Sequence, residues 1–129
     1  MALRLQPFEA FGDLPFSLDV EALIARLGPP NHCSRNAAAL NEYDYGHAVL
    51  RFQDNGRLEE ITQRAPVLQL DTVAIPFPAL GGFVRTQDGQ AFERAGFLVS
   101  PAFGLAFVPE EPDWVTALAR HCIPTWRAL

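Results

Sequence analysis

The chain has 129 residues, of which 49% are hydrophobic and 19% charged, and this composition excludes an intrinsically disordered protein. Its length fits a single domain, 1–129, that can bury a core without metal or disulfide staples. The formal net charge of −5 argues against direct contact with nucleic acid, because phosphates would be repelled, and favours a basic partner.

The chain contains no apolar run near the ~18–20 residues that a membrane-spanning helix needs. Its first residues include Glu9 and Asp13 and lack the continuous apolar stretch of a signal peptide. We therefore expect a cytoplasmic protein that makes no membrane contact. In that compartment Cys33 and Cys122 should be reduced thiols.

The clearest predicted helix covers residues 19–27. Ser17 or Asp19 can cap its start, and Gly28 followed by two prolines ends it. One apolar face follows the i, i+3, i+4, i+7 spacing of a buried helix side, formed by Val20, Leu23, Ile24 and Leu27.

The stretch "EYDYGHAVLRFQDNGRLEEI" predicts a β-hairpin over 42–63. Alternation places Ala48, Leu50 and Phe52 on the core face. The other face would then carry Tyr43, Tyr45, His47, Val49 and Arg51. Asn55-Gly56 suits a turn with positive φ. Alternation is irregular from Leu58 to Ile61, which leaves the register of the second strand open.

The second half predicts a helix at 78–86, where Pro78 can occupy the first turn, although the Gly81-Gly82 pair weakens it. Strands are predicted near 91–108. The final segment, "PEEPDWVTALARHC", predicts a helix capped by Asp113. One side of that helix would be lined by Trp114, Val115, Leu118 and Cys122.

This order of elements predicts an α+β fold, a single compact domain with an antiparallel sheet and two or three helices. Both halves consist of a helix followed by strands. We therefore interpret residues 14–65 and 72–122 as two degenerate α-β subunits, although no residue motif repeats cleanly between them.

Tyr43, Tyr45 and His47 are residue types that enzymes use to move protons, and on one strand face they could line a cavity. Asp44 would point the other way, and no spacing typical of a catalytic motif supports the row. The chain also lacks a nucleophile elbow, a phosphate-binding loop and a dinucleotide fingerprint. We therefore expect no catalytic residues and no enzyme activity.

Two His-Cys pairs, His32-Cys33 and His121-Cys122, raise the question of a zinc site. The usual ligand spacings are missing, and adjacent side chains tend to diverge. Cys122 also suits the apolar side of the last predicted helix, where a thiol behaves as a small hydrophobe. We therefore predict neither a metal nor a cofactor.

Acidic residues remain as the clearest functional signal, in two groups beside aromatic side chains. Such combinations are found at protein–protein interfaces, although solvated surface is the simpler reading of any single acid. The predicted partner-binding residues are Tyr43, Tyr45, His47, Asp54, Glu59, Glu60, Glu110, Glu111, Asp113 and Trp114.

The segments "LPFSLDVEALIARLGPP" and "YDYGHAVLRFQDNGRLEEI", within residues 14–63, resemble immunity proteins of polymorphic toxin and type VI secretion systems. In architecture they also resemble tandem helix-sheet inhibitors of the β-lactamase-inhibitor type. The resemblance implies a protein that binds and occludes a cognate bacterial toxin in the cytoplasm and so protects the producing cell. The toxin would have a basic active-site cleft. No individual residue role is carried over.

Two alternatives stay open. One is a small α+β enzyme or ligand-binding protein whose pocket is lined by Tyr43, Tyr45 and His47. The other is a secretion chaperone or adaptor, which would bind a non-catalytic region of an effector protein.

Overall fold

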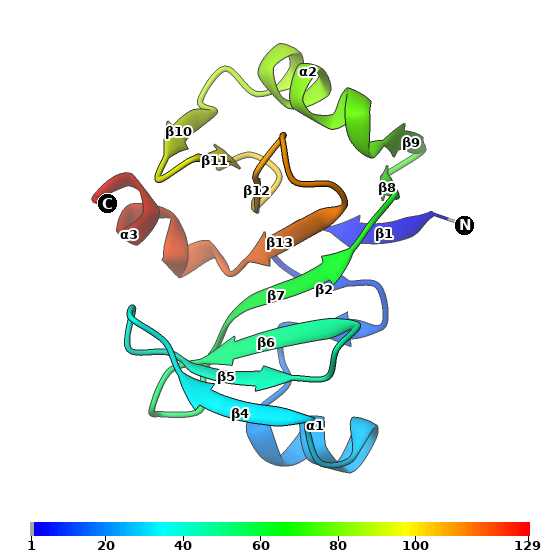
Figure 1. The fold of residues 1–129 in the computed structure, drawn as a ribbon. Helices are drawn as coiled ribbons and strands as arrows, with labels where there is room; N and C mark the ends of the chain where they lie inside the picture. Colours follow the sequence, from blue (N-terminus) through cyan, green and yellow to red (C-terminus); the bar gives the residue numbers. More distant parts are fainter. Residues whose placement is uncertain (1) are drawn as a thin grey trace.

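An eight-stranded antiparallel sheet runs through the structure, a computed structural model that describes residues 2–129. The strands lie in the order β10-β11-β12-β13-β7-β6-β5-β4 (Figure 1). Their bounds are β4 His32–Arg35, β5 Asn41–Asp44, β6 Ala48–Phe52, β7 Leu58–Arg64, β10 Phe92–Arg94, β11 Phe97–Ser100, β12 Leu105–Phe107 and β13 Trp114–Leu118.

A smaller five-stranded sheet has the order β3-β2-β1-β8-β9. Its strands are β1 Leu3–Gln6, β2 Ala10–Phe11, β3 Leu14–Pro15, β8 Val67–Leu70 and β9 Val73–Pro76. Strand β1 pairs in parallel with β8, so this sheet joins the start of the chain to its middle. The predicted α+β class is confirmed, but the strands form two sheets and dominate over the helices.

The helices are α1 Val20–Leu27, α2 Phe77–Gln87, the 3₁₀ turn η1 Arg120–Cys122 and α3 Ile123–Arg127. The first two confirm the predicted helices. Asp19 caps α1 by accepting a hydrogen bond of 2.8 Å from the amide of Ala22. Leu23 is fully buried, whereas Ile24 is 40% exposed, so the buried face of α1 is narrower than the sequence predicts. None of the helices within 2–129 has the length and apolar character needed to cross a membrane.

The two halves of the chain repeat one arrangement. A helix, α1 or α2, is followed by four strands, β4–β7 or β10–β13, and the two last strands pair as β7 and β13 at the centre of the sheet. Figure 1 shows α1 and α2 at opposite ends of the molecule. Residues 20, 23 and 27 of α1 recur as apolar residues 57 positions later, at 77, 80 and 84 of α2. The predicted subunits 14–65 and 72–122 each contain one such helix and its four strands.

The predicted hairpin over 42–63 contains three strands, because a turn at Tyr45-Gly46-His47 separates β5 from β6. Gly46 has a φ of 83°, and its amide donates to Oδ1 of Asp44 at 2.7 Å. Tyr43 consequently lies opposite Leu50 on the neighbouring strand. The prediction that Tyr43, Tyr45, His47, Val49 and Arg51 share one face is therefore wrong. The predicted core residues Ala48, Leu50 and Phe52 are all fully buried.

A β-bulge explains the irregular alternation after the Asn55-Gly56 turn. Arg51 pairs with Glu60 and Phe52 pairs with Leu58, so Glu59 is the extra residue of β7. The insertion lets Leu58 and Ile61 both face the core, which strict alternation would forbid. It also leaves the Glu59 side chain buried, unlike the surface position expected for an acid.

The helix predicted from Asp113 to Cys122 is wrong, because Trp114–Leu118 forms β13. Val115 and Ala117 face the core and alternate with Thr116, which is the period of two of a strand. Over so few residues the apolar positions also fit the period of a helix, so the sequence pattern alone does not distinguish the two. Strand β13 pairs with β12 on one side and with β7 on the other. These backbone pairings outweigh the local preference of the segment for a helix. Helical structure begins only at Arg120, and Cys122 is buried within it.

Hydrophobic residues form clusters on both faces of the large sheet. The inner face, which carries Leu50, Ile61, Leu105 and Ala117, packs with α1, α2 and the smaller sheet in the main core. On the outer face, η1 and α3 cover a second cluster through Cys122, Ile123 and Trp126. This second cluster is built on Val99, Ala106 and Leu118. The outer face is therefore apolar beside β11–β13 and polar toward β5–β7.

Candidate functional site

The centre of the outer face carries an ordered polar network around Arg51. Its Nε donates to Oε2 of Glu42 at 2.7 Å, and its Nη1 donates to Oγ1 of Thr62 at 2.7 Å and to Oε1 of Glu60 at 3.3 Å. Thr62 in turn shares a hydrogen bond of 2.8 Å with Thr116 across the β7–β13 pair. Burial raises the pKa of Glu60, and the nearby Arg51 charge partly offsets this rise.

Two pockets open on the outer face, and each is lined in part by residues of the network. The Arg51 pocket, about 160 Å³, is lined by Arg51, Thr62, Phe97, Val108, Glu111, Trp114 and Thr116. The Trp126 pocket, about 350 Å³, is lined by Asn36, Ala38, Leu40, Gln53, Glu59, Glu60, Cys122, Thr125, Trp126 and Leu129. Both pockets take residues from both halves of the chain. The Arg51 pocket lies across the line where β7 meets β13, and the Trp126 pocket lies between β7 and the C-terminal segment that contains Cys122 and Trp126.

A buried group of three chemically reactive side chains borders the Trp126 pocket. The Cys122 thiol donates to the Glu59 carboxylate at Oε2 and to the Glu59 carbonyl oxygen at 3.2 Å. Nε2 of His121 lies 2.8 Å from Oε1 of Glu59, outside hydrogen-bond geometry. Burial, together with Glu59 and Glu60, raises the pKa of the Cys122 thiol, which therefore stays protonated and is a poor nucleophile.

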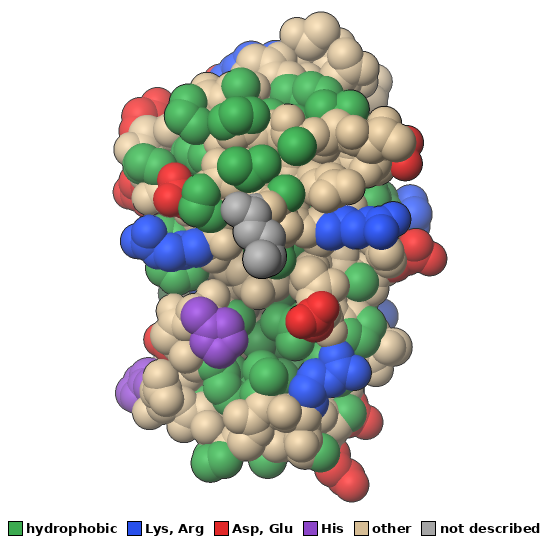
Figure 2. Space-filling view, turned by 90° about the vertical axis from the view of Figure 1, so that its right-hand side faces the viewer, with side chains coloured by type: hydrophobic (Ala, Val, Ile, Leu, Met, Phe, Trp, Pro, Cys, Tyr) green, Lys and Arg blue, Asp and Glu red, His purple; other side chains and the backbone are tan. Residues whose placement is uncertain are grey.

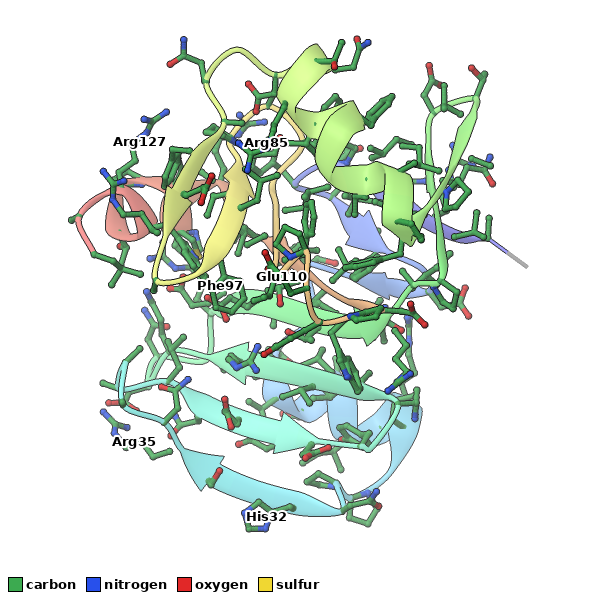
Figure 3. All side chains as sticks on the ribbon, turned by 45° about the horizontal axis from the view of Figure 1, so that its top comes forward. His32, Arg35, Arg85, Phe97, Glu110 and Arg127 are labelled. Atoms are coloured by element: carbon green, nitrogen blue, oxygen red, sulfur yellow. The ribbon has the colours of Figure 1, made fainter. Side chains whose placement is uncertain are left out.

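The convergence of His121 and Cys122 on Glu59 corrects the reasoning that adjacent side chains diverge. In the 3₁₀ turn η1 both side chains reach the same carboxylate, because the turn is anchored to the bulge by a 2.9 Å hydrogen bond from the Ala119 amide to the Glu59 carbonyl. The other pair, His32-Cys33, is exposed on the edge strand β4 (Figure 3). The four residues therefore do not form one site.

The alternative row of Tyr43, Tyr45 and His47 is dispersed by the turn after β5. Tyr45 is 9% exposed, and its hydroxyl donates to the carbonyl of Gly28 at 2.9 Å. Tyr43 is partly buried against the ring of Phe52, with centroids 5.5 Å apart. His47 is exposed and lines a different cavity of about 460 Å³ with Leu3, Arg4, Gly12, Asp13 and Gln63 among its other residues. These three side chains line no shared pocket in the described part of the chain.

The hydroxyl of Tyr45 provides a direct test of this assignment. We expect Tyr45→Phe to lower the free energy of unfolding by about 0.5–1.5 kcal/mol, because the ring stays packed while the Gly28 carbonyl loses its donor. Urea unfolding of the two proteins measures the difference. An unchanged midpoint and slope would show that this hydrogen bond contributes nothing to stability.

The predicted acidic residues are divided among different environments. Asp54 is exposed and pairs with Arg35, whose guanidinium hydrogen bonds hold the pKa of Asp54 below its ordinary value. Glu110 and Glu111 are exposed in the loop before β13, and no ion pair engages them among residues 2–129.

Asp113 and Trp114 both contact the side chain of Arg64 on the neighbouring strand β7. Nη1 of Arg64 lies 4.0 Å from Oδ2 of Asp113, and its guanidinium lies 4.9 Å from the centre of the Trp114 ring. The predicted set is thus brought together only in part, with Glu59 and Glu60 at one pocket and Glu111 and Trp114 at the other.

Three outer-face residues were missed by the sequence reasoning, namely Arg51, Thr62 and Thr116. Only the broken alternation at Glu59-Glu60 gave a signal, since it marked the bulge that places Glu59 beside the C-terminal turn. In comparisons with protein-family models, with curated proteins and with solved structures, the chain matched none.

Proposed function

We propose that this chain is an immunity protein, which binds a bacterial toxin through the outer face of its large sheet and blocks the toxin's active site. The observation that carries the proposal is the pair of pockets on the outer face, each lined from both halves of the chain, of which the Arg51 pocket lies across the β7–β13 line. A protein segment seated there would contact both repeated units at once.

The Arg51 network supports a binding surface that is already ordered in the free protein. The Arg51 guanidinium is held by hydrogen bonds to Glu42, Glu60 and Thr62 in the chain alone. An interface that is already ordered loses less conformational entropy on association, so more of its contact energy becomes affinity. Trp114 and Phe97 at the Arg51 pocket are aromatic residues of the kind that anchor protein interfaces.

The charge distribution supports a basic partner. The chain carries a net charge of −5. Glu111 lines the Arg51 pocket, Glu110 precedes it in the same exposed loop, and neither makes an ion pair among the described residues. Figure 2 shows a different side, where basic, acidic and apolar side chains are interspersed. A cationic toxin cleft would therefore be steered toward the loop before β13.

The repeated architecture adds support from resemblance. Each half of the chain consists of a helix followed by an antiparallel meander, and the two meanders form one sheet. The sequence resembles tandem helix-sheet inhibitors in this same arrangement. A broad antiparallel sheet of this kind offers an extended surface on which a partner protein can rest. Here that surface is the outer face from β5 to β13.

Co-expression with the toxin encoded by the neighbouring gene tests the proposal. We expect the chain to restore growth and to form a stoichiometric complex in which the toxin is inactive. A toxin that stays active in the complex would refute inhibition and indicate an adaptor. Failure both to bind and to rescue growth would refute the immunity function.

The acidic loop gives a sharper test in the same system. We expect Glu110→Gln with Glu111→Gln to slow association by about tenfold at low ionic strength, with a smaller effect at high salt, because long-range attraction is lost. The control removes two charges from the smaller sheet, Glu9→Gln with Asp71→Asn, and should leave the rate unchanged. Equal effects of both double variants would locate the binding surface elsewhere.

A further inference from the structure

Three potential metal ligands meet where the bulge of β7 contacts η1. A carboxylate oxygen of Glu59, a ring nitrogen of His121 and the sulfur of Cys122 all lie within 4.8 Å of one another. Glu59 is 6% exposed and Cys122 is 4% exposed, while the His121 side chain is 31% exposed. The group therefore lies at the boundary between the outer-face cluster and solvent.

The polar atoms of this group are incompletely satisfied. Oε1 of Glu59 and Nε2 of His121 are both buried, and neither has a hydrogen-bond partner within the part of the chain that the structure describes. Buried carboxylate oxygens normally have partners, because an unpartnered polar atom away from water is costly. A cation bound by these two atoms and the Cys122 sulfur would give both of them a partner.

The backbone holds the three side chains at this point. The bulge turns Glu59 toward the C-terminal turn, and bulges are enriched beside functional sites because they redirect a side chain. The amide of Ala119 donates to the Glu59 carbonyl at 2.9 Å, and the amide of Cys122 donates to the Ala119 carbonyl at 3.0 Å. The ligand positions are therefore set by strand and turn, independently of any exposed loop.

We propose that Glu59, His121 and Cys122 bind one zinc ion, with the fourth coordination position open to the Trp126 pocket. Zinc accepts carboxylate oxygen, imidazole nitrogen and thiolate sulfur together, at about 2.0–2.3 Å in a tetrahedral arrangement. On binding, the ion displaces the proton that the Cys122 thiol holds in the metal-free chain, and this proton is released to solvent. Calcium and magnesium prefer oxygen ligands alone, so this mixed set selects against them. Glu59 and Cys122 themselves line the pocket, which gives water or a partner's side chain access to the open position.

Cobalt(II) provides a probe that reports on the ligands directly. We expect the full chain to bind one equivalent of Co²⁺ with a thiolate-to-metal charge-transfer band, and Zn²⁺ to displace it. Cys122→Ser should abolish the band. His121→Gln, at a partly exposed side chain, should weaken Zn²⁺ binding by more than the roughly 10–100-fold that loss of an outer-shell group causes.

Matched controls come from the other His-Cys pair. His32→Gln and Cys33→Ser change the same residue types at exposed positions on β4, and both should retain the band and the Zn²⁺ affinity. Circular dichroism checks that each variant is folded, and a Zn²⁺-dependent rise in the melting temperature of the unaltered chain provides a readout that needs no variant.

Three results would overturn the site: no stoichiometric binding at micromolar Zn²⁺ and protein, a band that survives in folded Cys122→Ser, or a band lost in Cys33→Ser. This test needs no toxin. The zinc site and the immunity function can therefore fail separately.

Discussion

Replacing Leu23 by alanine is expected to lower the free energy of unfolding by about 2–5 kcal/mol. Leu23 is fully buried on α1, and truncation leaves a cavity that close-packed neighbours fill only in part. Leu80, at the equivalent position of α2, is equally buried, so Leu80→Ala should have a cost in the same range. Urea unfolding followed by far-ultraviolet circular dichroism measures both.

The neighbouring residue Ile24 is the matched control, since it is on the same helix but 40% exposed. We expect Ile24→Ala to cost less than about 1 kcal/mol. Because β7 and β13 join the halves in one sheet, Leu23→Ala and Leu80→Ala should each shift a single cooperative transition. Two separate transitions, or a Leu23→Ala cost no greater than that of Ile24→Ala, would contradict this description.

Asp88→Asn is expected to destabilise the chain by about 2–4 kcal/mol at neutral pH, because a buried carboxylate that accepts several hydrogen bonds becomes an amide. Oδ2 of Asp88 accepts from Ser100 Oγ at 2.7 Å and from the Ala102 amide at 3.1 Å, and Oδ1 accepts from the Gln90 amide at 2.9 Å. An asparagine amide group would present its own donors to at least one of these partners, whichever way it turns.

The effect of Asp88→Asn should depend on pH. Burial by itself raises the pKa of Asp88, but the hydrogen bonds from Ser100, Ala102 and Gln90 outweigh it and hold the pKa below its ordinary value. The stabilisation is therefore complete above the ordinary carboxyl pKa of about 3.9 and is lost as the pH falls through the lower, folded-state value. Asp88→Asn should lose part of its difference from the unaltered chain on going from pH 7 to pH 3.

The exposed residue Asp71 provides the control for this experiment. Asp71 has a φ of 54°, a conformation that asparagine also tolerates, so Asp71→Asn should be close to neutral at both pH values. A difference between Asp88→Asn and the unaltered chain that is the same at pH 7 and pH 3 would show that the Asp88 charge does not stabilise the fold.

Local sequence was sufficient where one rule acted without competition. The helix at 19–27 had a cap and a glycine stop, and both agree with α1, while its apolar stripe contained the buried Leu23. Alternation over Ala48, Leu50 and Phe52 identified a core strand, because those residues face one side in any register of β6.

Local sequence was insufficient where partners distant in the chain decided the outcome. Residues 114–118 fit a helix or a strand, and pairing with both β12 and β7 selects the strand. Gly46 could belong to a continuous strand, and only its positive φ shows the turn that disperses the tyrosines and His47. The meeting of Glu59 with Cys122 depends on a bulge and a turn 63 positions apart, which no local pattern encodes.

The repeated halves of the chain differ most in the segments that follow their last strands. After β7 the chain crosses to the smaller sheet as β8, whereas after β13 it turns back over the outer face as η1 and α3. The two halves are therefore alike in their helix and four strands but differ in the segment that follows, because η1 and α3 cover the outer face only after β13. The outer residues of β5 and β6 lie outside the cluster under Trp126, so substitutions there should leave that cluster intact.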